Sequence, residues 1–209
     1  IVVGKSDHCE VDPKKQKSVI RILNETTPLD TNWLRLTKFA SDYYQHSWGE
    51  VGLSCLPNFF RTKPGVRYQT SLEKLRKLKT TKLLSSDIKH ELNHEQKYAV
   101  NSLKSFDGFK PTVLFGVTGS GKTEVYLHMM ALTFERHPNA QILFLVPEIN
   151  LTPQLEARVR SFFTHKKIVC MHSGLSQGER ARSWLAMHEK HAQILIGTRM
   201  AVFASMPEL

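Results

Sequence analysis

The sequence has few of the features that would assign a protein to a class at once. Among 209 residues there are only three cysteines, Cys9, Cys55 and Cys170, and they are too far apart to suggest a disulfide framework or a metal site. No hydrophobic run approaches the roughly 18 residues that a membrane-spanning helix needs, and no secretory signal is visible. We therefore expect a protein of a reducing, cytoplasmic compartment that does not enter a membrane.

Acidic residues are also scarce relative to basic ones. The chain has 29 lysines and arginines against 19 aspartates and glutamates, which gives a formal net charge of +10. This balance favours a polyanionic partner, nucleic acid before an anionic membrane, with a generally basic surface as the plain alternative. The composition, 41% hydrophobic and 23% charged, is that of a globular protein with length for one large or two small domains.

The most specific motif is the glycine-rich octapeptide GVTGSGKT at residues 116–123, which we call the phosphate loop. It fits the pattern G-x-x-x-x-G-K-[ST], in which backbone N–H groups surround phosphate oxygens. Lys122 can reach the terminal phosphates, and the Thr123 hydroxyl can ligate Mg²⁺. The apolar run 112–115 before the loop predicts a buried strand, and residues 124–134 after it predict a helix. The predicted nucleotide-binding residues are Gly116, Val117, Thr118, Gly119, Ser120, Gly121, Lys122 and Thr123, with Lys122 and Thr123 as the catalytic candidates.

The rest of the C-terminal part alternates predicted strands and helices. Apolar runs at 141–146, 168–171 and 193–196 predict strands. A helix with a proline at its first position is expected at 152–163, and a capping box at 176–179 predicts another. With the strand before the phosphate loop, we expect four strands in a parallel, doubly wound α/β sheet whose carboxyl ends carry the ligands.

The N-terminal part has a different pattern, which favours a small, mostly β module with one helix. Runs at 1–3, 18–23 and 51–56 favour strands, and the apolar spacing of 31–44 predicts an amphipathic helix, capped by Thr31 and followed by Gly49. The helix aromatics are favoured as core over a base-stacking platform. A lysine-rich stretch then predicts a basic linker helix, which either touches nucleic acid or is simply solvated. The expected division is 1–62, a linker at 63–90, and 91–209.

Two further segments lie at the ends of predicted strands. They are VPEINLTPQ at 146–154 and Gly-Thr-Arg at 197–199. Helix N-termini, threonine hydroxyls and an arginine can hold sugar–phosphate oxygens without reading bases, although Thr152 can equally cap a helix and Arg199 can form a surface ion pair. Gln96 has two open interpretations, because it can complete a capping box with Asn93 or present its amide to an adenine.

These motifs, in this order, resemble the first motor lobe of the superfamily 2 helicases. The segments GVTGSGKTEVY, VPEINLTPQ, HSGL and GTR are most similar to the family of bacterial replication-restart DNA helicases (primosomal protein N′, PriA). A weaker similarity to that family's 3′-end DNA-binding domain covers residues 17–23 and the helix at 31–44.

The resemblance implies a RecA-like lobe that binds ATP and Mg²⁺, in an ATP-dependent 3′→5′ helicase for replication restart at stalled forks. It implies that Gln96 faces the adenine. The implied DNA contacts are Pro147, Glu148 and Thr152 of motif Ia, Thr198 and Arg199 of motif Ib, and Lys17 in the 3′-end pocket. Implied partners are single-stranded and forked DNA, primosome proteins and single-strand-binding proteins, at the bacterial nucleoid.

The sequence also departs from the family pattern. It stops before the acidic Asp-Glu box, and it lacks the second motor lobe with its arginine finger and the paired cysteines that bind zinc. Residues 61–90 are shorter than the family's winged-helix segment. We therefore expect zinc only in the absent C-terminal part, and ATP binding with negligible hydrolysis by these 209 residues. The open alternatives are an RNA-acting P-loop translocase and a non-enzymatic basic nucleic-acid-binding module.

Overall fold

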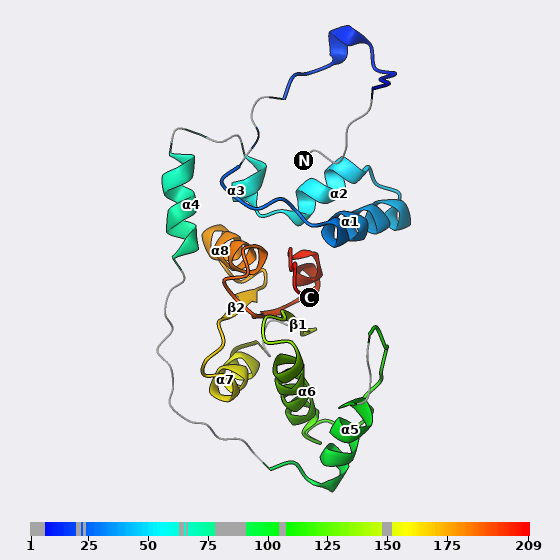
Figure 1. The fold of residues 1–209 in the computed structure, drawn as a ribbon, viewed down its shortest axis with the longest axis vertical. Helices are drawn as coiled ribbons and strands as arrows, with labels where there is room; N and C mark the ends of the chain where they lie inside the picture. The colour runs from blue at the N-terminus through cyan, green and yellow to red at the C-terminus, as the bar shows by residue number, and fades with distance from the viewer. Residues whose placement is uncertain are drawn as a thin grey trace.

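The computed structural model describes residues 7–19, 22, 24–62, 65, 67–77, 91–104, 108–147 and 152–209, with the side chain of Thr152 excepted. Figure 1 shows helices on both sides of a small central sheet. The elements in chain order are η1 (Pro13–Lys15), α1 (Thr31–Tyr44), α2 (Trp48–Cys55), α3 (Asn58–Arg61), α4 (Tyr68–Arg76), α5 (His94–Lys104), α6 (Lys122–Arg136), β1 (Ile142–Leu145), α7 (Thr152–Phe162), β2 (Ile168–Met171), α8 (Gln177–His188), β3 (Ile194–Gly197) and η3 (Arg199–Phe203).

The sheet is parallel, as the sequence predicts. Its order is β1-β3-β2, and Leu195 of the central strand lies in register with Leu143 on one side and Val169 on the other. Every residue of β3 is buried. A continuous apolar strand of this kind is typical of parallel sheets that are covered on both faces.

Alternate strand residues face two separate cores. Leu195 and Val169 point to a core shared with α8 and η3, whereas Ile194 and Ile196 point to a core shared with α6 and α7. In Figure 1, α8 and η3 lie on the side of the sheet towards α1–α3, and α6 and α7 lie on the other side. The alternation of side chains along each strand thus builds a three-layer arrangement.

The first core also includes the N-terminal helices. Trp33 of α1, Leu56 after α2 and Leu72 of α4 are buried in the same core as Trp184 of α8, and the Trp33 indole N–H donates to the Phe203 carbonyl of η3 at 2.8 Å. Residues 68–76, within the predicted linker, therefore form a helix that packs on α8. The division at 62 and 90 stays a prediction, and the described residues on both sides of it share this core.

Two expectations about α1 and α2 are wrong. Asp30, rather than Thr31, caps α1, since its carboxylate accepts from the Trp33 N–H at 2.8 Å. Residues 51–56, expected as a strand, largely belong to α2, whose N-terminus is capped by Ser47. Gly52 and Cys55 both face the core and are three residues apart, which is the spacing of a helix. The strand prediction overlooked this spacing. Of the other predicted strands in this part, 1–3 lies outside the described residues, and so does half of 18–23. The described residues of that run, Ser18, Val19 and Ile22, are not in a strand.

The expected strand at 112–115 is also wrong. Its residues are irregular, and Val113 and Phe115 are 89% and 97% exposed. A strand exists only when its backbone finds a hydrogen-bonded neighbour, and this run pairs with none of the three described strands.

The aromatic residues of α1 divide between core and surface. Trp33 is buried as predicted, but Phe39, Tyr43 and Tyr44 are exposed. The core face of α1 consists of Trp33, Thr37, Ala40 and Ser41, and the exposed aromatics stand outside it. Helical spacing alone does not say how wide the buried stripe is. Within the described part of the chain, no helix has the length and apolarity to cross a membrane.

Candidate functional site

The phosphate loop wraps around the ammonium group of its own lysine. Lys122 begins α6, and its Nζ donates to the carbonyl oxygens of Gly116 at 2.7 Å and Val117 at 2.8 Å. Ser120 closes the turn by donating its N–H to Val117 O at 3.2 Å. The loop therefore holds a positive charge at the N-terminus of a 15-residue helix, an arrangement that attracts anions.

Glycine is favoured at two points of the loop by positive φ angles, which are +80° at Gly119 and +79° at Gly121. Gly121, the N-cap of α6, has φ +79°, and a Cβ there would lie 2.2 Å from the Gln96 amide nitrogen. A Cβ on Gly116 would lie 2.8 Å from Ser120 Oγ. The backbone of the loop therefore has the conformation that its glycines permit, and binding of a triphosphate there stays a prediction.

Gln96 completes the predicted capping box and also contacts the phosphate loop. Its Oε1 accepts from the Asn93 N–H at 2.9 Å while Asn93 Oδ1 accepts from the Gln96 N–H at 2.8 Å, which is the predicted capping box. Its Nε2 lies 3.3 Å and 3.4 Å from the carbonyl oxygens of Ser120 and Gly121. The start of α5 therefore lies against the phosphate loop, whereas a contact of the Gln96 amide with adenine stays a prediction.

Three strand ends meet at one edge of the sheet. The Val146 N–H donates to Gly197 O at 2.9 Å, and the Thr198 N–H donates to Met171 O at 3.2 Å. Pro147 and Thr198 consequently follow neighbouring strands. Pro147 and Arg199 are exposed and Thr198 is half-buried. We call Pro147, Thr198 and Arg199 the strand-end rim.

Of the remaining predicted DNA contacts, the structure describes the side chain of Lys17 alone. Lys17 is exposed next to η1, which extends away from the rest of the chain in Figure 1. Glu148 lies outside the described residues, and for Thr152 the structure gives the start of α7 but no side chain.

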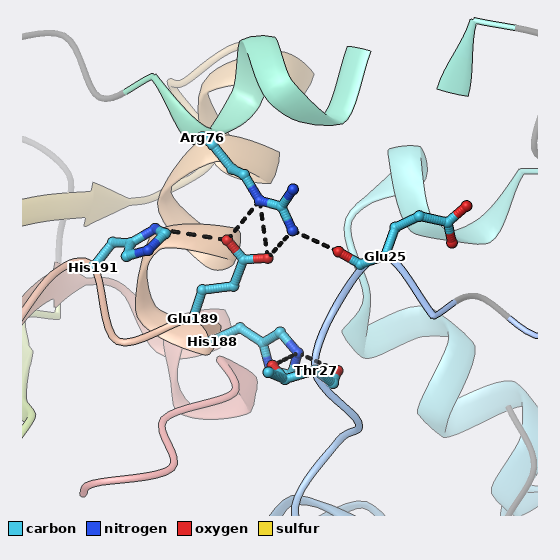
Figure 2. Close-up of polar contacts among 6 residues, drawn as sticks. All are labelled: Glu25, Thr27, Arg76, His188, Glu189 and His191. Carbon is cyan, nitrogen blue, oxygen red and sulfur yellow. Dashed lines mark hydrogen bonds and ion pairs between the residues drawn. The ribbon is translucent and has the colours of Figure 1, made fainter. Parts of the chain in front are cut away.

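Sequence reasoning missed a polar junction between the N-terminal segment, α4 and α8. It lines a pocket of about 870 Å³, none of whose lining residues belongs to the phosphate loop. Arg76 donates from Nε to both carboxylate oxygens of Glu189 and from Nη2 to Glu25 O (Figure 2). These residues are far apart in sequence, so no local motif could have found them.

His188 is the buried titratable group of this junction. Its Nε2 lies 2.7 Å from Thr27 O, and its Nδ1 lies 2.9 Å from Ser205 Oγ (Figure 2 shows the Thr27 contact). Burial lowers the pKa of His188, and the Thr27 carbonyl and the charges of Glu189 and Asp30 oppose this only in part. The imidazole is therefore held neutral, as a structural link.

Cys170 offers no thiolate to the site. Burial raises the pKa of Cys170 to about 12, so its thiol stays protonated. The described residues also contain no group of three or more His, Cys, Asp or Glu side chains that could hold a metal.

Comparison with known proteins agrees with this geometry. Residues 89–208 match the family described as "Type III restriction enzyme, res subunit". The chain belongs to this family. Residues 1–57 match the family described as "3'DNA-binding domain (3'BD)". The first match implies a helicase-type lobe that uses a nucleotide, and the second implies DNA binding, so the resemblance seen in the motifs is confirmed.

The curated relatives carry the name replication restart protein PriA. The chain is 42% identical to that of Synechocystis over 148 residues, which is 70% of this chain and 17% of the relative. It is 31% identical to that of Haemophilus influenzae over 197 residues, 94% of this chain and 25% of the relative. It is 39% identical to that of Bacillus subtilis over 121 residues, which is 56% of this chain and 15% of the relative. The chain thus spans less than a third of each of these relatives.

Proposed function

We propose that this chain is the nucleotide-binding and DNA-binding part of an ATP-dependent 3′→5′ DNA helicase that acts in replication restart. The phosphate loop binds the triphosphate, with Lys122 on the terminal phosphates and the Thr123 hydroxyl on Mg²⁺. Single-stranded or forked DNA is bound by the strand-end rim together with Glu148, the start of α7 and Lys17. Hydrolysis of bound ATP would supply the free energy for movement along the strand.

The observation that carries this proposal is the contact between Gln96 and the phosphate loop. Two segments that are separate in the sequence meet here, since the Gln96 amide and the Lys122 ammonium both bond to carbonyl oxygens of the phosphate loop. A glutamine amide can both donate to and accept from the adenine edge. The loop binds phosphates of any nucleotide, and Gln96 adds the preference for adenine.

The test is nucleotide selectivity in Gln96→Glu. Glutamate keeps the oxygen that accepts from the Asn93 N–H, so the capping of α5 survives, but it loses the amide donor. We expect the wild type to bind a fluorescent ATP analogue. ATP should displace this analogue at a concentration at least tenfold lower than GTP does. In Gln96→Glu, ATP and GTP should displace the analogue equally well. An unchanged ATP preference in Gln96→Glu would remove the assigned role, and a wild type without nucleotide affinity would overturn the proposal.

The proposal also distinguishes DNA from the RNA alternative. The rim and the basic surface bind phosphates electrostatically, so affinity for a single-stranded oligonucleotide should fall steeply with salt. We expect a deoxyoligonucleotide to bind more tightly than the ribo-oligonucleotide of the same sequence at each salt concentration, measured by fluorescence anisotropy. Tighter binding of the RNA would favour an RNA-acting translocase instead.

The partners and place of action follow from the same proposal. Primosome proteins and single-strand-binding proteins would meet this chain at forked DNA in the bacterial nucleoid. Zinc would be bound only by a region outside these 209 residues.

A further inference from the structure

Glu124 and Arg158 form a two-pronged ion pair between α6 and α7. The Arg158 Nε donates to Glu124 Oε1 at 2.8 Å, and its Nη2 donates to Oε2 at 2.7 Å. The side chains are 21% exposed for Arg158 and 16% for Glu124. Neither residue has a role in the proposed function so far.

The pair joins the two helices, α6 and α7, that cover the same face of the sheet. Glu124 is the third residue of α6, directly after Lys122 and Thr123, and its N–H donates to Gly121 O at 3.0 Å. Arg158 lies on α7, which begins immediately after the segment that follows β1. One carboxylate is therefore fixed to the phosphate loop, and its arginine is fixed to the helix that leads from the strand-end rim.

Stability alone does not explain this pair. The helices α6 and α7 are already packed together by apolar side chains, among them Leu127 and Val159, which are both fully buried. A largely buried ion pair typically contributes no more stability than an apolar pair of similar volume. An acidic residue in the first turn of α6 is also favourable without a partner.

The geometry of the pair instead suits transmission of position. The planar guanidinium binds both oxygens of the carboxylate, so it fixes direction as well as distance. A shift in the first turn of α6 must therefore be followed by α7 or break two charged hydrogen bonds.

We propose that Glu124 and Arg158 are positioning residues that couple nucleotide binding at the phosphate loop to DNA binding at the strand-end rim. This inference rests on the proposed function. It states that the two ligands bind cooperatively, because a phosphate seated in the loop sets the first turn of α6 and, through the pair, the orientation of α7. Thermodynamic linkage requires DNA to raise nucleotide affinity by the same factor.

The experiment measures this factor directly. The dissociation constant of a fluorescent ATP analogue with Mg²⁺ is determined without and with a saturating thymidine oligonucleotide, for wild type, Arg158→Met and Arg160→Met. Arg160 is the matched control, because it lies on the same helix and its carboxylate partner, Glu156, is also on α7. Retained structure is checked by circular dichroism, and Arg158→Lys, which keeps the charge without the fork, serves if Arg158→Met does not fold.

We expect a coupling factor of at least about fivefold in wild type and in Arg160→Met, in the usual range for coupled sites. In Arg158→Met it should fall to about one, with each ligand's separate affinity changed by less than about threefold, and in Arg158→Lys it should be intermediate. A wild type that binds both ligands without coupling, or an Arg158→Met or Arg158→Lys variant that keeps the full factor, would refute the inference while leaving the proposed function intact. Failure of the wild type to bind either ligand would instead refute the proposed function.

Discussion

Gly197 shows how a single residue positions the strand-end rim. A Cβ on it would lie 2.3 Å from Ala201 Cβ and 2.7 Å from Met171 O. Because Gly197 has no Cβ, β3 can pass directly into η3, with Thr198 and Arg199 at the turn. The glycine of the Gly-Thr-Arg motif is thus explained by packing, and the two residues after it carry the proposed function.

Gly197→Ala should therefore destabilise the protein by about 1–3 kcal/mol or more, because an added methyl group meets backbone that cannot move aside. Gly178→Ala is the matched control. Gly178 lies in α8 with nothing within 4 Å of its Cβ position, and alanine there should raise stability by up to about 1 kcal/mol. Chemical denaturation of both variants checks the prediction. Equal effects in the two variants would contradict the close packing at Gly197.

Among the helices and strands, several were predicted correctly from local sequence patterns, such as capping residues and runs of apolar residues. The capping box of α8 is present, with Ser176 Oγ accepting from the Glu179 N–H and the Glu179 carboxylate accepting from the Ser176 N–H. The helix at 31–44 and the strand at 168–171 have the predicted bounds.

The central strand makes an element-scale prediction. Leu195 is fully buried in β3, whereas Leu145, at the end of β1, is 46% exposed. Leu195→Ala should cost about 2–5 kcal/mol in the free energy of unfolding, since it loses transfer energy and leaves a cavity. Leu145→Ala should cost about 1 kcal/mol. Urea titrations give both values, and a cost for Leu145→Ala as large as that for Leu195→Ala would show that the order β1-β3-β2 does not place β3 at the centre.

The predictions made from sequence were wrong for two strands, because a strand depends on hydrogen-bonding partners far along the chain. The runs at 51–56 and 112–115 have the composition of strands, yet one is largely helical and the other is unpaired. For the candidate site, the phosphate loop and the capping role of Gln96 were predictable from spacing. The contact of Gln96 with the loop, the Glu124–Arg158 pair and the Arg76–Glu189 junction are tertiary, and no spacing rule indicates them.

At the scale of the whole molecule, the N-terminal segment is held to the α/β part by apolar and polar contacts together. Trp33 and Leu72 enter the core of α8, and Arg76 and His188 bind the segment before α1 (Figure 2). A neutral imidazole is one of these contacts, so the junction depends on pH.

We expect the junction to weaken in acid. Because the pKa of folded His188 lies below its unfolded value of about 6.5, the unfolded chain takes up the proton first, and His188 contributes its full stability only above that pH. Stability should be lost as pH falls through 6.5 towards the folded pKa. The fall in melting temperature between pH 7.5 and 5.5 should be smaller in His188→Gln than in wild type. His165→Gln, which changes an exposed histidine, should match wild type. An identical pH dependence in His188→Gln would contradict this role.

The central claim is that the phosphate loop and Gln96 form the nucleotide site of a DNA motor lobe. Titration of a fluorescent ATP analogue with Mg²⁺ against wild type, Lys122→Ala and Lys104→Ala tests it most directly. Lys122 lies inside the loop, whereas Lys104 is an exposed lysine at the end of α5. We expect saturable binding by wild type and Lys104→Ala, and at least tenfold weaker binding by Lys122→Ala, because a charge-assisted phosphate contact is lost. Equal binding by Lys122→Ala and wild type would contradict it.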